Sequence, residues 1–303
     1  MSLPGKTLLL IFNPKAGVQT LRARLFDVVD AFTAAGYLVT VYPTQAAGEV
    51  GTTVAALGAA YDLLVCAGGD GTVSEAINAI MDMAEKPAAF GFIPSGTVND
   101  FAVSLGVPTD VVTAAEVILN GAPRLVDVGR FDEKHFIYVA AFGLFTDVSY
   151  STSQSAKNWL GKVAYFLEGA KRVGQLIAYS CEFDIDGEYI AGEFIFGAIA
   201  NTHSIAGIKM PTGMNAQMDD GLFDVILIKK PENLKDGQEI IASLLAHEEK
   251  SPYVTFRKAK KIDFHAFQEV PWTLDGDFGG EFYRAEIVNL QQAAAVITPP
   301  PAC

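Results

Sequence analysis

The chain has 303 residues, of which half are apolar and 19% are charged, so it can bury one large core or two cores of ordinary size. Its net charge is −13, and neither residues 1–130 nor the remainder is basic, which argues against nucleic acid as a partner and against strong electrostatic docking on anionic lipid. No apolar run reaches the roughly 18 residues of a membrane span, the N-terminus lacks a signal-peptide pattern, and the three cysteines are too scattered for a disulfide framework, so we expect no transmembrane segment and a cytoplasmic location.

The first 130 residues alternate between apolar runs and segments with helical spacing. The expected strands are Leu8–Asn13, Tyr37–Tyr42, Asp62–Ala67 and Ala88–Ile93. The expected helices are Leu21–Ala35, Val50–Ala60, Thr72–Ala84 and Val111–Leu119. Strands that alternate with helices imply right-handed crossovers, and nearly continuous apolar strands fit a sheet that is covered on both faces. The pattern therefore predicts an α/β N-terminal domain with a mostly parallel, doubly wound sheet.

The pattern changes near residue 130, where short runs of alternating polarity take over. The expected strands are His135–Phe142, Ala178–Ile185, Glu193–Ala200, Leu222–Ile228, Ile262–Phe267 and Glu281–Val288. Turn pairs such as Asp186-Gly187 and Asp275-Gly276 separate several of them, and two helices are expected near Lys157–Val173 and Leu234–His247. We therefore expect domains at residues 1–130 and 131–303, the second an antiparallel β-sandwich, and leave open whether the last strand returns to the first domain.

Three turns of the first domain combine glycine with small polar residues at the end of an expected strand. They are Asn13–Gly17, Gly68–Thr72 and Pro94–Asp100. Ligands of open parallel sheets bind beyond the carboxyl ends of the strands, where glycine lets the backbone approach closely and the amides at a helix start favour phosphate. One such turn is equally well explained as an ordinary connection, but three at neighbouring strand ends predict a phosphate site. A P-loop and a dinucleotide fingerprint are excluded, because G-x-x-x-x-G-K-[ST] is missing and no third glycine follows Gly71 in register.

The chain resembles the diacylglycerol kinase catalytic-domain family, especially the soluble bacterial lipid kinases related to diacylglycerol and sphingosine kinases. The resemblance covers nearly the whole chain, and the motifs that carry it are Asn13–Gly17, Gly68–Thr72 with Glu75, Ser95–Ala102, Asp219–Gly221 and Leu274–Asp277. It implies a phosphotransferase that uses ATP and Mg²⁺ to phosphorylate a lipid hydroxyl, with diacylglycerol or a related lipid as acceptor. It also implies that the nucleotide lies in a cleft between the two domains.

The resemblance implies a set of nucleotide-binding residues, drawn mainly from the glycine loops. They are Asn13, Pro14, Lys15, Ala16, Gly17, Thr44, Gly69, Asp70, Gly71, Thr72, Glu75, Gly96 and Thr97. The glycine loops are expected from the residues themselves as well, whereas Thr44 considered alone is only a turn residue.

The resemblance also implies a magnesium site in the second domain. Asp220 would supply a carboxylate, and Gln217 and Leu222 would supply backbone oxygens. A water network would link this ion to Asp70, Asp100 and Asp127 in the first domain. Oxygen ligands in a loop suit a hard cation. From the residues alone, the simpler interpretation of Asp219–Gly221 is a turn before a strand.

Asp277 stands where the family has a glutamate that acts as proton acceptor, directly after the Asp275-Gly276 turn. Its side chain is one methylene shorter, and a general base must come within about 3 Å of the hydroxyl that it deprotonates. The resemblance therefore implies catalytic roles for Asp277 as the base and for Asp70 in ordering metal and water. Slower turnover or another acceptor is left open.

A lipid acceptor requires transient contact with a membrane surface. Lys157–Val173 has the stripe of an amphipathic docking helix, although core packing explains such a stripe more often. Arg257–Lys261 is the dense basic run of the chain and is expected to be a solvated hairpin edge. A homodimer is left open, because some relatives in the family are dimers.

Two other functions stay open. An NAD kinase shares the glycine-aspartate loop and the plan of two domains, although Thr97–Phe101 and Asp219–Gly221 favour the lipid kinase. The aspartate at position 277 supports the third alternative, a nucleotide- or lipid-binding protein with weakened catalysis.

Overall fold

The computed structural model describes residues 5–14, 20–87, 89–97, 99–144, 176–201, 204–205, 208–209, 217–246 and 251–300. It consists of two compact units, one made of Met1–Asp127 with Gln292–Cys303 and the other of Val128–Gln291. Two strands, β5 (Ala122–Phe131) and β15 (Asp277–Thr298), carry the chain across this boundary. The first unit is therefore built from two separate parts of the sequence. Among the described helices, none has the length and apolar character needed to cross a membrane.

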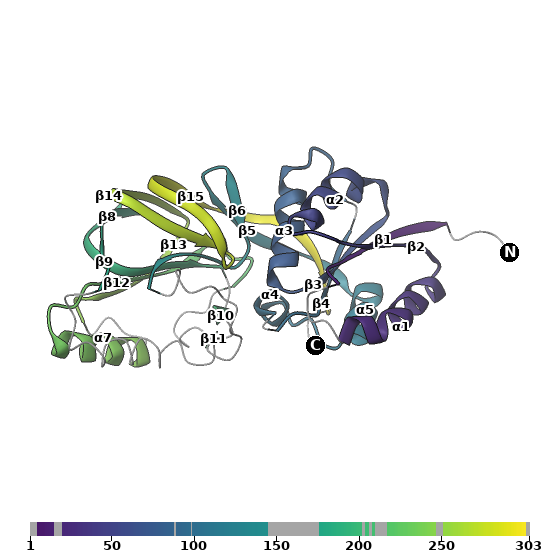
Figure 1. The fold of residues 1–303 in the computed structure, drawn as a ribbon, viewed down its shortest axis with the longest axis horizontal. Helices are drawn as coiled ribbons and strands as arrows, with labels where there is room; N and C mark the ends of the chain where they lie inside the picture. Colours follow the sequence, from purple (N-terminus) through teal and green to yellow (C-terminus); the bar gives the residue numbers. More distant parts are fainter. Residues whose placement is uncertain are drawn as a thin grey trace. The chain divides into compact units, whose positions relative to one another are not determined.

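The first unit is built on a parallel sheet with the strand order β2-β1-β3-β4. Its strands are β1 (Lys6–Phe12), β2 (Tyr37–Pro43), β3 (Leu63–Gly68) and β4 (Phe90–Pro94). Its helices are α1 (Thr20–Ala34), α2 (Glu49–Leu57), η1 (Gly58–Ala60), α3 (Asp70–Asp82), α4 (Asp100–Ser104) and α5 (Val111–Asn120). Helix α1 packs against α5 and α2 packs against α3, and Figure 1 shows these two pairs on opposite faces of the sheet. The predicted doubly wound parallel sheet is confirmed.

Burial in this sheet follows strand position. Strands β3 and β4 are buried along their whole length, as expected for apolar strands that are covered on both faces. Strand β2 lies at the edge of the sheet and keeps no fully buried residue. Since all four strands run parallel, their carboxyl ends share one edge, where the predicted glycine loops begin.

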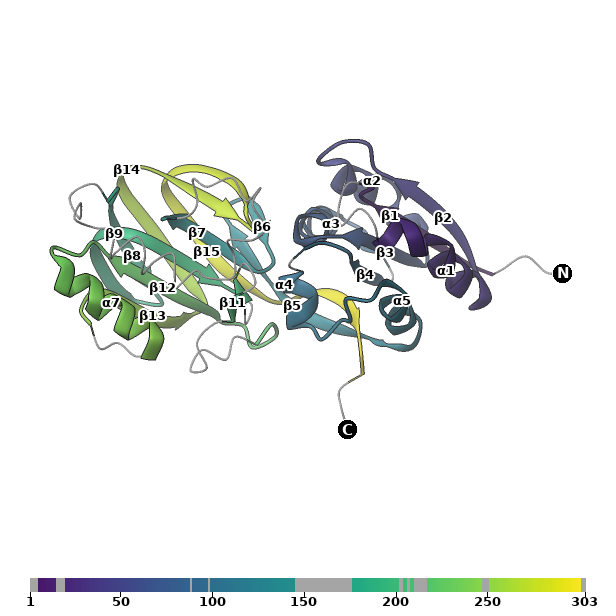
Figure 2. The same cartoon turned by 60° about the horizontal axis from the view of Figure 1, so that its bottom comes forward.

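The second unit is built on a nine-stranded antiparallel sheet with the order β13-β12-β9-β7-β14-β15-β5-β6, in which β8 pairs with β9 and β14. The strands not yet given are β6 (Lys134–Phe136), β7 (Val139–Gly143), β8 (Tyr179–Ile185), β9 (Glu188–Ala200), β12 (Phe223–Lys229), β13 (Val254–Ala259) and β14 (Lys261–Leu274). A short hairpin pairs β10 (Ser204–Ile205) with β11 (Ile208–Lys209). Helix α7 (Leu234–Ala246) packs against β13, and Figure 2 shows it beside this end of the sheet.

The sheet of the second unit curls around one aromatic core. Phe136 on β6 stacks on Phe223 of β12 with 5.4 Å between ring centroids, although the two strands lie near opposite ends of the strand order. Trp272 is fully buried and contacts Phe131 at 5.0 Å and Phe142 at 4.8 Å between centroids. Full burial of one large apolar side chain is worth about 1.5–3 kcal/mol, so this core holds the curled sheet closed. The predicted antiparallel β-domain is confirmed.

Several element boundaries differ from the sequence-based expectation. The strand expected at His135–Phe142 is broken at Ile137 and Tyr138, because their backbone N–H groups donate to the carboxylate of Asp275 instead of to a neighbouring strand. Strands β5 and β13 and helix α4 were not expected, and β15 is much longer than Glu281–Val288. The amphipathic segment expected at Lys157–Val173 lies outside the described residues.

Candidate active site

The ends of three parallel strands are joined by backbone hydrogen bonds at one edge of the first unit. The N–H of Asn13 donates to the carbonyl of Ala67 at 3.2 Å, which ties the end of β1 to β3. The N–H of Thr44 donates to the carbonyl of Phe12 at 3.0 Å, and its buried hydroxyl lies 3.4 Å from the same oxygen. The structure thus brings Asn13 and Thr44 together with the glycine loops.

The two glycine loops touch each other through their backbones. The N–H of Ser95 donates to the carbonyl of Gly68 at 2.7 Å. A Cβ atom built on Gly96 would lie 2.5 Å from the Cα of Gly69, closer than real side chains approach. Only glycine fits this contact, and it lets the two loop backbones approach each other closely.

Asn99 holds the second glycine loop closed. Its side-chain oxygen accepts the N–H of Gly96 at 2.9 Å, and its amide donates to the carbonyl of the same residue at 2.9 Å. Its φ of 58° lies in the left-handed region, which asparagine tolerates better than most residues. Asn99 was part of the motif that carried the resemblance, but it was not predicted as a site residue. The signal that could have found it is this pairing of asparagine with the glycine three residues before it.

Asp70 links the starts of the two helices that follow the glycine loops. It is the first residue of α3, and its Oδ1 accepts the N–H of Phe101 in α4 at 3.1 Å. Burial raises the pKa of the Asp70 carboxyl, and the nearby charge of Asp100 raises it further, whereas the hydrogen bond from Phe101 lowers it. Two acidic groups therefore lie in a poorly hydrated place, where positive charge is favoured.

Two buried polar atoms near this edge have no hydrogen-bond partner among the described residues. They are Oε2 of Glu75 and Oγ of Ser95. The other carboxylate oxygen of Glu75 accepts the N–H of Gly48 at 3.3 Å. A buried polar atom without a partner costs about 1–3 kcal/mol, so hydrogen-bonding groups of a ligand are a natural complement. Ser95, like Asn99, was quoted in the motif but not predicted as a site residue.

The remaining residues of the predicted nucleotide set differ in exposure. Gly71 and Thr97 are exposed, Pro14 is half-buried, and the buried Thr72 side chain fills the space that a Cβ on Gly68 would need. Lys15, Ala16 and Gly17 lie outside the described residues.

Asp127, predicted as part of the water network, lies on β5 and is fully buried. Its Oδ1 accepts the N–H of Gln292 at 2.8 Å, so it anchors the part of β15 that returns to the first unit. Asp70 and Asp100 lie close enough to interact electrostatically, whereas the hydrogen bond described for Asp127 is to this returning strand.

In the second unit, a buried aspartate fixes the turn that precedes Asp277. The carboxylate of Asp275 accepts the N–H groups of Ile137 at 2.8 Å, Tyr138 at 2.9 Å and Val139 at 3.1 Å. The hydroxyl of Tyr138 also donates to the Asp275 carbonyl. From sequence, Asp275 was interpreted as a turn residue, and its anchoring role was missed because its partners lie more than 130 positions away.

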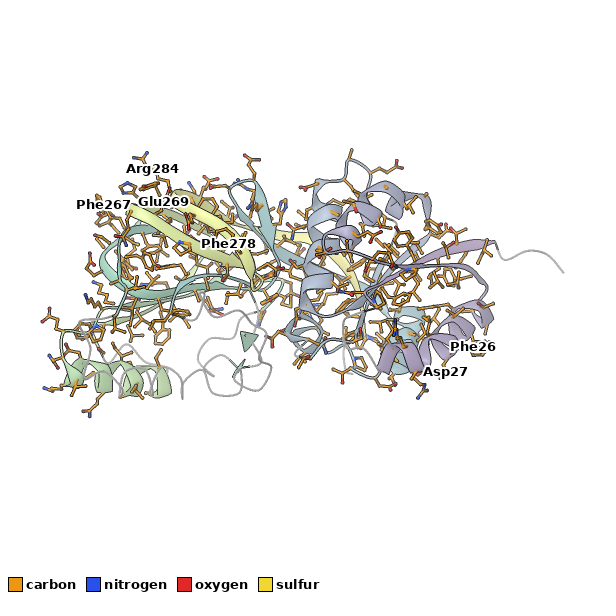
Figure 3. The ribbon with its side chains drawn as sticks, viewed as in Figure 1. Phe26, Asp27, Phe267, Glu269, Phe278 and Arg284 are labelled. Carbon is orange, nitrogen blue, oxygen red and sulfur yellow. The ribbon has the colours of Figure 1, made fainter. Side chains whose placement is uncertain are left out.

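Asp277 itself begins β15 and is exposed, as is its neighbour Phe278, which is 70% exposed and labelled in Figure 3. Asp275 and Gly276 have φ values of 52° and 92°, as in the tight turns that join antiparallel strands. The turn thus presents the carboxylate of Asp277 to solvent from a fixed backbone.

The predicted metal turn is also closed by an aspartate. Oδ1 of Asp220 accepts the N–H of Leu222 at 3.0 Å across Gly221, whose φ is 76°. Gln217 is exposed, and Oδ2 of Asp220 lies 3.4 Å from Nζ of Lys258. Within the described ranges, no three His, Cys, Asp or Glu side chains gather as a metal cluster, but one carboxylate and two backbone oxygens do not require such a cluster. This donor set fits a hard divalent cation.

Lys258 also pairs with a buried carboxylate. Asp224 on β12 is 1% exposed and lies directly across from Lys258 on β13, with 3.7 Å between Oδ1 and Nζ. Burial raises the pKa of Asp224 to about 6, the charge of Lys258 opposes this rise, and Asp220 adds to it. The lysine thus faces two carboxylates.

Other cations of the basic run at Arg257–Lys261 are paired as well. Arg257 binds both carboxylate oxygens of Glu188 at 2.7 Å, and Lys261 lies 3.0 Å from Asp263 and from Glu286. Ion pairs therefore hold Arg257, Lys258 and Lys261, while the three lysines of the run, Lys258, Lys260 and Lys261, are exposed, as expected for a solvated hairpin edge.

Comparison with known proteins places this arrangement in a family. The model of the diacylglycerol kinase catalytic domain matches residues 7–131, and that of the YegS C-terminal NAD kinase beta sandwich-like domain matches residues 139–293. Proteins named diacylglycerol kinase from Staphylococcus carnosus (strain TM300) and Staphylococcus saprophyticus are each 34% identical over 291 residues, which cover 96% of this chain and 94% of each relative. The chain belongs to the diacylglycerol kinase family. It is accordingly a phosphotransferase with an alcohol acceptor.

Solved structures share the fold. A diacylglycerol kinase from Bacillus anthracis str. Sterne is 25% identical and superposes with a TM-score of 0.75 over 98% of both chains. An NAD kinase from Archaeoglobus fulgidus in complex with ATP superposes with a TM-score of 0.52 at 12% identity, over 96% of this chain and 93% of that chain. The second likeness is one of fold alone.

Proposed function

We propose that this chain transfers the γ-phosphoryl group of ATP to the hydroxyl of diacylglycerol or a closely related lipid. The observation that carries the proposal is the backbone contact between the loops of Gly69 and Gly96, together with the carboxylate of Asp70, which joins the starts of the two helices that follow these loops. The names of the relatives supply the acceptor class.

The glycine loops suit the phosphates of the nucleotide. Their N–H groups lie at the carboxyl edge of a parallel sheet and at the start of α3, where backbone dipoles favour negative charge. The buried Oε2 of Glu75 and Oγ of Ser95 would gain hydrogen-bond partners from the hydroxyl or amino groups of the nucleoside. Asn13, Thr44 and Thr97 complete the proposed nucleotide site.

The proposed Mg²⁺ site uses the turn at Asp220 with the backbone oxygens of Gln217 and Leu222. The ion would supply positive charge that offsets the negative charge of the nucleotide phosphates and would order water around it. In the first unit, Asp70 and Asp100 would order water and metal from their poorly hydrated positions.

The chemical step consists of one proton transfer and one phosphoryl transfer. The lipid hydroxyl gives its proton to the carboxylate of Asp277, and its oxygen forms a bond to the γ-phosphorus. The bond between that phosphorus and the β–γ bridging oxygen breaks, and ADP leaves. The exposed position of Asp277 and the fixed turn before it support this role, because a general base must come within hydrogen-bond reach of the hydroxyl that it deprotonates.

The acceptor would be met transiently at a membrane surface. Exposed Phe278 directly follows Asp277 in β15, so an exposed apolar residue is next to the proposed base in the chain. A lipid with its hydroxyl at the interface is the kind of acceptor that such a pair fits.

The test is transfer of radiolabelled phosphate from ATP to diacylglycerol in mixed micelles, with the product identified by chromatography. We expect Asp277→Asn to lower kcat by about 10²–10⁴, because the base is lost, and Asp277→Glu to retain or raise it. Glu281→Gln is the matched control, since Glu281 is an exposed acid four positions further along the same strand. Full turnover in Asp277→Asn would remove Asp277 as the base.

The same purified protein can be used to test the two alternative functions, an NAD kinase and a binding protein without catalysis. NAD in place of the lipid tests for NAD kinase activity, and label in NADP with none in phosphatidic acid would replace the proposal. ATP binding without transfer to any of a broad panel of lipids would indicate a binding protein with lost catalysis, which the aspartate at position 277 would then explain.

A further inference from the structure

Lys258 in the second unit forms ion pairs with two aspartates, one buried and one partly exposed. Nζ of Lys258 lies 3.7 Å from Oδ1 of Asp224 and 3.4 Å from Oδ2 of Asp220. Asp224 is 1% exposed, whereas the side chain of Asp220 is 22% exposed. The ammonium group thus lies between a carboxylate in the core and one near the surface.

The buried member of this cluster depends on the lysine. Neither carboxylate oxygen of Asp224 has a hydrogen bond among the described residues, so the ion pair with Lys258 is its compensation. A buried carboxylate is strongly unfavourable without a positive partner. Lys258 is held directly opposite Asp224 by the register of β12 and β13, and this pairing does not require Asp220.

The more exposed member offers one oxygen to an external ligand. Oδ1 of Asp220 is used by the N–H of Leu222, which closes the turn. Oδ2 is the oxygen that faces Lys258. A divalent cation that binds Oδ2 of Asp220 approaches an oxygen beside which a unit positive charge already lies.

The lysine has room to give way. Its side chain is 39% exposed and ends in a flexible chain of methylenes, so it can withdraw from Asp220 and remain on Asp224. Asp224 would then hold the ammonium near the cation without letting it compete for the same oxygen.

We propose that Lys258 is a tethered competitor for the divalent cation at Asp220, displaced from Asp220 toward Asp224 when the cation binds. This inference depends on the metal site included in the proposed function. The competition lowers the affinity for the cation and makes occupancy responsive to its concentration, while Asp224 keeps the displaced charge compensated.

The test is direct binding of Mn²⁺ to the full chain, without nucleotide or lipid, measured from the electron paramagnetic resonance signal of the free ion. Lys258→Met removes the charge and keeps most of the side-chain volume. We expect it to tighten Mn²⁺ binding about tenfold, within the range usual for coupling between adjacent sites. Lys260→Met is the matched control, because Lys260 is an exposed cation two positions away, and we expect it to leave the affinity unchanged.

Two further variants test whether an unpaired buried charge disturbs the fold and whether the cation binds at Asp220. Lys258→Met with Asp224→Asn removes both members of the buried pair and leaves no unpaired charge, and it should show the same tightening. Adding Asp220→Asn to Lys258→Met should abolish the gain. Equal affinities in wild type and in both Lys258→Met proteins, a gain that survives Asp220→Asn, or an equal gain in Lys260→Met would each overturn the proposal. Because the readout is ion binding, a failed kinase assay leaves this test intact.

Discussion

The glycine loops of the first unit and the Asp275 turn of the second unit fix their backbones by opposite means. In the loops, Gly69 and Gly96 touch because neither has a side chain. In the turn, a buried side chain, the carboxylate of Asp275, collects three backbone N–H groups from one distant segment. The first region therefore depends on the absence of side chains at two glycines, and the second depends on one buried carboxylate.

This difference determines how each region can fail. An added methyl group in the loops displaces backbone at the ligand site itself, while the sheet beneath is unaffected. A lost carboxylate in the turn leaves buried N–H groups without partners, which weakens the fold of the second unit. The first region should therefore lose binding before stability, and the second should lose stability first.

The largest expected effect is in the glycine loops. We expect Gly96→Ala to weaken ATP binding at least about 100-fold, because its Cβ would lie 2.5 Å from the Cα of Gly69 and must push the loops apart. Isothermal titration calorimetry measures the change, and the melting temperature should fall less than it does in Asp275→Ala, since overpacking costs about 1–3 kcal/mol. Gly58→Ala is the control, since its Cβ would meet the nearest atom at an ordinary 3.5 Å. Wild-type ATP affinity in Gly96→Ala would show that the contact does not shape the site.

The next effect separates two aspartates that lie two positions apart. We expect Asp275→Ala to lower the free energy of unfolding of the second unit by about 3 kcal/mol, because three buried N–H groups lose a charged acceptor. Asp277→Asn should leave that stability unchanged. Urea unfolding followed by tryptophan fluorescence reports on this unit, since Trp159 and Trp272 both lie within Val128–Gln291. Equal stability of the two variants would contradict the anchoring role of Asp275.

The smallest effect is a gain in stability at a residue assigned to function. The pKa of Asp70 is raised by burial in the folded chain, so the folded state keeps this proton to higher pH than the unfolded state does. Stability contributed by the protonated carboxyl is therefore lost as the pH rises from its ordinary pKa through the raised one. Asp70→Asn removes this loss and should raise the melting temperature at pH 7.5 by about 2–4 °C, while turnover disappears.

The gain in Asp70→Asn should shrink as the pH approaches 4, where the native carboxyl also becomes neutral. Asp30→Asn, at an exposed position of α1, is the control and should show no gain at either pH. A lower melting temperature at pH 7.5 would show that the charged form of Asp70 is favoured in the fold.

The elements predicted well from sequence are those whose pattern is set locally. Strands β1 and β3 are short apolar runs that end in glycine-containing turns, and the spacing of α1 shows one buried face. The burial of these elements follows from their own residues, so their type and position can be predicted without knowing which elements pack against them.

The elements missed are those whose shape depends on distant partners. The break between β6 and β7 comes from Asp275, which takes the N–H groups of Ile137 and Tyr138 away from any strand. Helix α4 has only five residues, which is too short for a recognisable helical spacing, and it starts after Asn99 in the left-handed conformation.

The candidate site divides in the same way. The contact of Gly69 with Gly96 could be anticipated, because parallel strands end at a shared edge. The pairing of Lys258 with Asp224 could not be anticipated. It depends on the register of β12 against β13, and helix α7 separates these two strands in the sequence. Lys258 therefore looked from sequence like one more cation in a basic run.

The return of Gln292–Thr298 to the first unit has a consequence for synthesis on the ribosome. Asp127 is synthesised long before Gln292, whose N–H it accepts, and Gly121 long before Thr298, whose carbonyl it packs against. At the usual rate of about 5–20 residues per second, the ribosome needs on the order of ten to thirty seconds to travel from the first of these positions to the second. During that interval the ribosome adds the second unit, whereas the half that carries the glycine loops still lacks the strand segment Gln292–Thr298.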